Sequence, residues 1–128
     1  MKNYLNKMFI NILNGQVVKT RVINQTRKKI CEAILKILWS EGFILGYEVD
    51  LKNKNKLNIF LKYVDNRPAI NVIKLLSLPS RRVHYSSKQI WKINSNKSFV
   101  IFSTNKGFLS VYNCKKFNIG GEPFIVIN

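Results

Sequence analysis

Two amphipathic helices are predicted in the first third of the chain from the spacing of its apolar residues. The first lies within residues 1–16. Asn14-Gly15 is expected to stop it, because Gly15 can take the left-handed conformation that closes many helices. The second begins at an N-cap, Thr26, and ends at Gly42. The apolar stripes of the two helices are Leu5, Met8, Phe9, Ile12 and Leu13, and Ile30, Ala33, Ile34, Ile37 and Leu38.

Strands are predicted where apolar residues alternate or run together. In the first half they cover residues 17–23, 43–51 and 57–63, with a basic turn at 52–56. The sequence Asp65-Asn66-Arg67-Pro68 is typical of a turn, and we expect shorter elements beyond it. The first is an extended segment at 69–76, whose residues also fit a short helix. A strand at 82–85, a helix from Ser86 or Ser87 to 93 and a turn at 94–98 follow. The last elements are a buried strand at 99–103, a helix at 111–117 between Ser110 and a left-handed Asn118, and a strand at 124–127.

This order of elements predicts an α+β fold made of two packed α/β subdomains. Residues 1–67 are expected to form an N-terminal subdomain with the order helix, strand, helix, strand, strand. Residues 68–128 are expected to form a C-terminal subdomain, a mostly antiparallel sheet with short helices. A chain of 128 residues with 46% hydrophobic residues can bury a core of this size.

The charge balance narrows the choice of partner. The chain has 22 Lys and Arg against 6 Asp and Glu, a net charge of +16. So large an excess favours a polyanion, RNA or DNA before a membrane, although a solvated basic surface is the alternative. The basic residues are scattered along the whole chain, which favours a broad docking surface over a basic tail. No apolar run is long enough for a transmembrane helix. With RNA or DNA favoured as the polyanion, no membrane partner is predicted.

The cysteines and the amino-acid composition indicate the cell compartment in which the protein works. Cys31 and Cys114 lie among apolar residues on predicted helices without metal-ligand spacing, so we predict reduced thiols in or near the core and no metal. The chain has 16 Asn, 17 Lys and 16 Ile, residues with A/T-rich codons, which favours an AT-rich genome such as that of an organelle or an endosymbiont. Residues 1–16 predict a helix rather than a cleavable presequence.

Two glycine-marked elements near the end of the chain are the strongest functional signal. Ser103-Thr104-Asn105-Lys106-Gly107 offers hydroxyls, an amide, a cation and a bare backbone, the groups that a surface needs to contact RNA by shape and 2′-hydroxyls. Taken alone, this sequence also fits an ordinary hairpin turn. Gly120-Gly121-Glu122 follows after one predicted helix, and its carboxylate can accept hydrogen bonds from base amino groups or 2′-hydroxyls. A purely local structural role is the alternative for Glu122.

The two elements together, at this spacing, resemble the C-terminal signature of the small-subunit ribosomal protein eight family: Ser-Thr-Ser-x-Gly, a short helix, Gly-Gly-Glu and a closing strand. Asn105 stands in place of the third hydroxyl residue. The resemblance extends upstream through Ile12–Gln16, Glu41–Ile44, Leu61–Tyr63 and Ser77–Val83. It implies a structural ribosomal protein that binds the central domain of small-subunit rRNA, beside neighbouring small-subunit proteins, and supports subunit assembly. It implies no catalysis, no cofactor and no small-molecule substrate.

The residues expected to bind rRNA come from three places. The resemblance implies Ser103, Thr104, Asn105, Lys106, Gly107 and Glu122, together with Arg82 and Tyr85 upstream. The third place, Arg27-Lys28-Lys29, follows from the residues themselves. Cations at the start of a helix oppose its dipole, which suggests that an outside phosphate holds them; a solvated basic turn is the alternative.

Two other classes of function stay open at this stage. A small basic ribonuclease could use His84, the one histidine of the chain, with Lys or Arg, although acid–base catalysis usually needs two positioned partners. A free RNA chaperone would bind without preference for rRNA. The AT-rich composition and the altered family positions predict a mitochondrial ribosome, with a plastid or the bacterial cytoplasm as alternatives.

Overall fold

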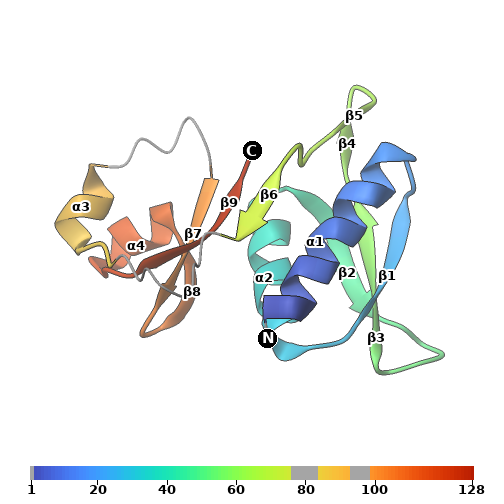
Figure 1. Cartoon of the computed structure of the whole chain (residues 1–128), viewed down its shortest axis with the longest axis horizontal. Coiled ribbons are helices and arrows are strands. Elements are labelled where there is room, and N and C mark those ends of the chain that lie inside the picture. Colours follow the sequence, from blue (N-terminus) through green and yellow to red (C-terminus); the bar gives the residue numbers. More distant parts are fainter. Residues whose placement is uncertain (1, 76–83, 93–98) are drawn as a thin grey trace. The chain divides into compact units, whose positions relative to one another are not determined.

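The computed structural model in Figure 1 describes residues 2–75, 84–92 and 99–128 of the chain. Helices and antiparallel sheets make it an α+β protein, as the sequence predicted. The chain divides into two compact units, which we call unit 1 (Met1–Asn71) and unit 2 (Val72–Asn128). Arg67 and Pro68, where the sequence analysis divided the chain, lie inside unit 1.

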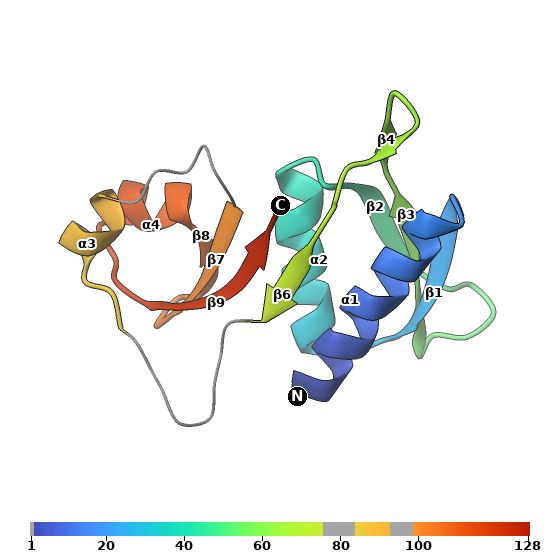
Figure 2. The ribbon, with the colours of Figure 1, turned by 45° about the horizontal axis from the view of Figure 1, so that its top comes forward.

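Unit 1 packs two helices against one face of a three-stranded antiparallel sheet of order β1-β3-β2, as Figures 1 and 2 show. The buried residues of β3 alternate with less buried ones, so a single face of the sheet meets the helices. A two-stranded hairpin follows, with positive φ at both turn residues, Asp65 and Asn66. The elements are α1 (Lys2–Val17), β1 (Val22–Thr26), α2 (Lys29–Ser40), β2 (Ile44–Val49), β3 (Lys56–Leu61), β4 (Tyr63–Val64) and β5 (Arg67–Pro68).

The first helix is longer than the sequence predicted. Helix α1 runs through Gly15 to Val17, and Lys19 rather than Gly15 takes the positive φ after it. Gly15 serves close packing instead, because a Cβ there would lie 2.8 Å from Ile23 Cγ2 and 3.0 Å from Leu61 Cδ1. The strand predicted at 17–23 therefore begins only at Val22.

The predicted start of the second helix was also wrong. Thr26 belongs to β1, where it pairs with Lys56, so it cannot be the N-cap. That position is Lys28, whose extended backbone precedes the helix without a side-chain hydrogen bond. The predicted end is confirmed, since Gly42 has a φ of 81° just after the helix. The strand predicted at 57–63 is divided in the structure into β3 and β4.

Unit 2 is built on a four-stranded antiparallel sheet of order β6-β9-β7-β8. Helices α3 and α4 pack on each other, and Ile90, Phe102, Val111 and Cys114 form their shared core with the sheet. The elements are β6 (Ile73–Leu75), α3 (Ser87–Trp91), β7 (Phe99–Thr104), β8 (Gly107–Ser110), α4 (Val111–Phe117) and β9 (Glu122–Ile127). The turn predicted at 94–98 and the first half of the strand predicted at 82–85 lie outside the described residues.

Several local predictions in unit 2 are confirmed. Ser86 caps α3 in a capping box with Gln89, and Ser110 caps α4 by accepting a hydrogen bond from the Asn113 N–H. Asn118 leaves α4 in the left-handed conformation. The apolar pattern predicted no strand after Gly107, whereas the structure has β8 there.

Both cysteines are buried and unpaired, as their apolar surroundings predicted. Cys31 lies in α2 of unit 1, and Cys114 lies in α4 of unit 2. Burial raises the pKa of each thiol above its ordinary value, because the thiolate loses hydration there. The two sulfurs are therefore core groups held in the unreactive thiol form.

Candidate nucleic-acid interface

An open hollow of about 400 Å³ joins the two glycine-marked elements in unit 2. One side comes from the end of β7 and the turn after it, Ser103–Asn105, and the other from Gly120–Glu122 at the start of β9. The hollow forms because β7 and β9 are paired antiparallel, with Ser103 opposite Glu122. His84 completes its lining. Two segments separated by a helix in the sequence are thus brought to one place.

The double glycine allows three backbone segments to meet beside this hollow. Gly121 exchanges two backbone hydrogen bonds with Tyr85, of 2.8 and 2.9 Å. A Cβ on Gly121 would lie 2.7 Å from the Ser103 carbonyl oxygen, and one on Gly120 would lie 2.5 Å from the Tyr85 carbonyl oxygen. Real Cβ atoms do not come so close to backbone oxygens. Both glycines are therefore required by packing within the protein.

The segment Ser103–Gly107 is a hairpin, since Thr104 pairs with Gly107 across the two-residue turn Asn105-Lys106. The Thr104 hydroxyl donates to the Gly107 carbonyl (2.7 Å) and accepts from the Lys106 N–H (3.2 Å), so it is used within the turn. The Ser103 hydroxyl is exposed, and the described residues offer it no hydrogen-bond partner. Of the two hydroxyls, Ser103 is the one that can bind a ligand without breaking the turn.

Glu122 and His84 give the hollow its remaining polar groups. Glu122 is partly buried and is the single carboxylate in the sequence of unit 2, which has nine Lys and Arg. His84 is exposed, and its ring lies near Gly120, where a Cβ would be 3.2 Å from His84 Cε1. From the sequence, His84 was a candidate for catalysis alone, and its place beside the predicted RNA-binding residues was not predicted.

Tyr85 supports the hollow from the core. Its ring is partly buried and lies 6.0 Å from the Phe102 ring, centroid to centroid. Its backbone holds Gly121 through the paired hydrogen bonds. Tyr85 therefore positions the double glycine through its backbone, and contact of its side chain with RNA stays a prediction. Arg82, the other upstream residue expected to bind RNA, lies outside the described residues.

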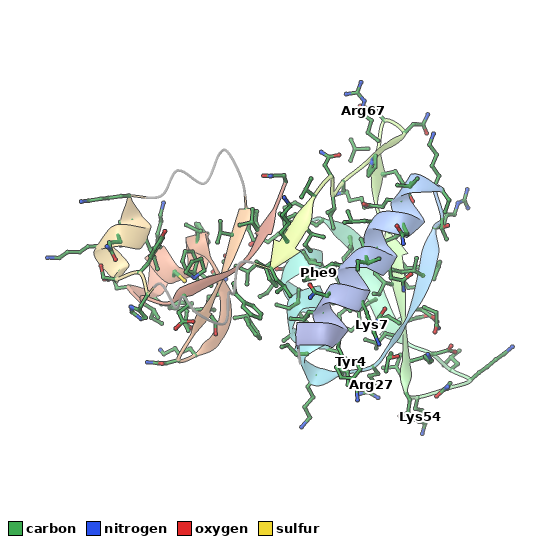
Figure 3. The ribbon with its side chains drawn as sticks, in the orientation of Figure 1. Tyr4, Lys7, Phe9, Arg27, Lys54 and Arg67 are labelled. Carbon is green, nitrogen blue, oxygen red and sulfur yellow. The ribbon has the colours of Figure 1, made fainter. Side chains whose placement is uncertain are left out.

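Two of the three cations at the start of α2 have partners within unit 1. Arg27 Nη1 donates to the Lys54 carbonyl oxygen (3.3 Å), and its Nε lies 3.6 Å from Glu32 Oε2. Lys28 Nζ lies 4.6 Å from the centroid of the Tyr4 ring. Figure 3 shows Tyr4, Arg27 and Lys54 at the same end of unit 1. Glu32 in the first helical turn also satisfies part of the helix dipole, which leaves exposed Lys29 as the better phosphate ligand.

A larger hollow, of about 880 Å³, lies in unit 1 between the end of α2 and the β4–β5 hairpin. Lys62 and Arg67 line it together with Glu41 and Asp65. The mixed charges suit a polyanion less well than the smaller hollow in unit 2, and none of the predicted RNA-binding residues lines it. Size alone therefore does not make it the better candidate.

The part of the chain that the structure describes lacks two kinds of feature. No group of three or more His, Cys, Asp or Glu side chains is placed to hold a metal ion. None of the described helices has both the length and the apolar character needed to cross a bilayer.

Comparison with known proteins gives one family over almost the whole chain. The family model described as Ribosomal protein S8 matches residues 3–127. The small ribosomal subunit protein uS8 of Alcanivorax borkumensis is 38% identical over 122 residues, which are 95% of this chain and 94% of that protein. The proteins of the same name from Ectopseudomonas mendocina and Wigglesworthia glossinidia brevipalpis are 34% and 33% identical, over 99% and 95% of this chain and 98% and 94% of their own lengths.

The family match covers the region of the chain that forms the hollow in unit 2. The family is one of structural ribosomal proteins and is not an enzyme family. Its matched region includes both elements that line the hollow and the double glycine that their packing requires. The chain belongs to the ribosomal protein S8 family.

Proposed function

We propose that this chain is a structural constituent of the small ribosomal subunit, which binds the central domain of the small-subunit rRNA and supports assembly of the subunit. The observation that supports this most is the hollow of unit 2. It combines a serine hydroxyl, an amide and a carboxylate in a unit whose sequence has nine Lys and Arg. Neighbouring small-subunit proteins are the other expected partners.

Each group at the hollow has a distinct task in this proposal. Ser103 and Asn105 donate and accept hydrogen bonds to 2′-hydroxyls and base edges, and Glu122 accepts from donors such as base amino groups. Lys106, exposed in the turn, neutralises a phosphate. Gly107 leaves room for the RNA backbone, because nothing lies within 4 Å of the place its Cβ would occupy. Further phosphate ligands are still predicted at Arg82, Arg27, Lys28 and Lys29.

Removing the Ser103 hydroxyl tests the recognition step. Ser103→Ala should lower the preference for the cognate rRNA helix over an unrelated duplex by about 1–3 kcal/mol, as when one partner of a desolvated hydrogen bond is lost. Binding of the unrelated duplex should hardly change, because no cation is removed. The measurement is a parallel titration of both RNAs at one salt concentration, after thermal unfolding has shown that the variant folds.

Two other substitutions in the hairpin serve as controls. Lys106→Ala should weaken both RNAs alike, because it removes charge and no base contact. Thr104→Val should lower the stability of the hairpin, because its hydroxyl is bonded twice within the turn. Equal weakening of both RNAs by Ser103→Ala, or no effect on either, would rule out this hollow as the recognition site.

Glu122→Gln tests the carboxylate with the least change of shape. If Glu122 accepts hydrogen bonds from rRNA, this variant should bind the cognate rRNA less tightly, even though removing a negative charge strengthens general attraction to RNA. A loss of affinity is then opposite in sign to bulk electrostatics. Filter binding of the cognate helix and of an unrelated duplex measures it. Unchanged or tighter cognate binding would leave Glu122 with a local structural role.

We also propose that the chain has no catalytic activity. A ribonuclease remains the alternative to test, because His84 and Glu122 line the same hollow and acid–base cleavage of RNA needs two such groups. Incubation of metal-free protein with the cognate RNA, for the wild type and His84→Ala, should show no cleavage in either case. Cleavage that disappears in His84→Ala would favour the enzyme.

For the compartment, the named relatives are bacterial proteins, which supports a ribosome of bacterial type. The mitochondrial ribosome remains our prediction from the composition, with a plastid or the bacterial cytoplasm as alternatives. Fractionation of the source cells, followed by sedimentation of the chain with ribosomal particles, distinguishes these places and separates a ribosomal protein from a free RNA chaperone.

A further inference from the structure

Unit 2 exposes three large aromatic side chains on its helices. Trp91 at the end of α3 is 56% exposed, and Tyr112 and Phe117 of α4 are 69% and 51% exposed. None of these rings is needed to fill the core, which consists of Ile90, Phe102, Val111 and Cys114 with their neighbours. Exposed aromatic rings gathered on a small unit indicate a contact surface.

Lysine side chains accompany these rings. Lys115 Nζ lies 5.8 Å from the centroid of Trp91, and Lys106 and Lys116 lie 5.9 and 5.8 Å from the centroid of Phe117. These distances are close to the outer limit of a cation–π contact, so each contact is weak. The ammonium groups of Lys106 and Lys116 can therefore turn to a phosphate at little cost while staying beside Phe117.

The rings and lysines lie on α4 and directly beside it. Trp91 is fixed against the end of α4 by a hydrogen bond of 3.2 Å from its Nε1 to Asn118 Oδ1. Lys115 and Lys116 follow Tyr112 by three and four residues, which places them one helical turn away on the same side. Phe117 lies on the flank of α4 that Lys106 reaches. We call Trp91, Tyr112, Lys115, Lys116, Phe117 and Lys106 the aromatic–lysine band.

The band begins where the hollow ends. Lys106 belongs to the β7–β8 turn, and the residue before it, Asn105, lines the hollow. A nucleic acid strand bound at the hollow therefore has the band as the next surface of the same unit. The single carboxylate of the unit, Glu122, belongs to the hollow, and neither α3 nor α4 contains an acidic residue.

We propose that the aromatic–lysine band binds unpaired nucleotides of RNA, stacking bases on Trp91, Tyr112 and Phe117 while the lysines neutralise the flanking phosphates. This inference rests on the proposed function, since it extends the bound RNA beyond the hollow. Aromatic rings alternating with cations are the pattern by which proteins hold single strands without base specificity. Protein–protein interfaces are depleted in lysine, whereas all the charged residues of this band are lysines.

The two tryptophans of the chain, Trp39 and Trp91, provide a direct probe. Trp39 in α2 of unit 1 is 51% exposed, and its ring packs edge-on against Tyr47 at 5.8 Å between centroids. Trp39→Phe leaves Trp91 as the only indole, and Trp91→Phe leaves Trp39. A short oligoadenylate added to the first variant should quench its emission strongly, because adenine stacks on the indole. The same oligoadenylate should leave the emission of the second variant unchanged.

Affinity tests the rest of the band. Tyr112→Leu with Phe117→Leu should weaken oligoadenylate binding about five- to a hundredfold, the range expected for losing stacked bases. Trp39→Leu is the matched control, an equally exposed aromatic residue outside the band, and should bind as the wild type. A fully paired RNA duplex should bind all three proteins alike, because its bases cannot reach the rings.

The outcomes separate this inference from the hollow. Quenching of Trp91 by oligoadenylate supports the band even if Ser103→Ala leaves rRNA discrimination unchanged, in which case only the hollow fails. Absent quenching, or equal quenching by duplex and single strand, overturns the band whatever Ser103→Ala shows. If purified ribosomal proteins quench Trp91 and oligoadenylate does not, the surface belongs to a protein partner and the RNA proposal is wrong.

Discussion

Gly121→Ala should destabilise unit 2 by about 3 kcal/mol and abolish specific rRNA binding. The added Cβ would lie 2.7 Å from the Ser103 carbonyl oxygen and 2.8 Å from Thr104 Cγ2. A backbone oxygen cannot turn aside as a flexible side chain can, so β7 and β9 must separate or Gly121 must lose its hydrogen bonds to Tyr85. Overpacking of this kind costs about 1–3 kcal/mol before any hydrogen bond is lost. Ser103 and Glu122 would also be displaced from each other.

Urea unfolding and titration of the cognate rRNA helix measure the two effects. Gly107→Ala is the matched control for the loss of stability, a glycine of the β7–β8 hairpin with no atom within 4 Å of its Cβ position. Its φ of 100° still makes alanine unfavourable, by about 1–2 kcal/mol, without pushing the strands apart. We therefore expect Gly107→Ala to keep β7 and β9 paired, so that any loss of rRNA affinity in this variant reports the room that Gly107 leaves for the RNA backbone. If Gly121→Ala proved as stable as the wild type, the packing role of the double glycine would be wrong.

The double glycine shows how far a sequence motif can be interpreted. From the sequence, Gly120-Gly121 marked an element whose Glu122 carboxylate was expected to accept hydrogen bonds from RNA, and close approach of a ligand to the backbone was expected at Gly107. The structure gives the glycines an internal reason as well, because the segments at Tyr85 and Ser103 occupy the space that side chains would need. Only Gly107 has open space at its Cβ position, so of these three glycines it is the one that suits close approach by RNA.

Elements with a regular apolar period were predictable, and their ends were less so. The stripe of α1 gave the helix, but Asn14-Gly15 gave the wrong end, since a glycine can also serve the contact between helix and sheet. Thr26 has the chemistry of an N-cap, yet strand pairing with Lys56 takes precedence over that local preference. In unit 2, Ser110 and Asn118 have no competing partner in the sheet, and their cap positions were predicted correctly.

The site was predictable mainly through the family resemblance. Ser103 and Glu122 are nineteen positions apart, and no local rule indicates that β7 and β9 pair there. The role of the Thr104 hydroxyl within the turn depends on two hydrogen bonds that the sequence does not reveal. The aromatic–lysine band had a sequence signal, Tyr112, Lys115, Lys116 and Phe117 on one short helix, but Trp91 joins it only through the packing of α3 on α4.

Raising the salt concentration should weaken binding of the cognate rRNA more than any single substitution outside the core. Unit 2 alone carries nine Lys and Arg against one carboxylate, and unit 1 adds thirteen against five. If several of these cations contact phosphates, the logarithm of the binding constant should fall with the logarithm of salt concentration with a slope of about −4 or steeper. A fourfold rise in salt then lowers affinity about 250-fold or more.

The slope also tests individual residues, because each phosphate contact adds about 0.7–0.9 to its magnitude. Lys106→Ala should make the slope shallower by roughly that amount, whereas Ser103→Ala should leave the slope unchanged and shift only the affinity for the cognate helix. Equilibrium titrations at four or more salt concentrations with all three proteins give the slopes. A slope near zero for the wild type would contradict docking through phosphates. An unchanged slope in Lys106→Ala would remove that lysine from the contact and, with it, the connection between the hollow and the aromatic–lysine band.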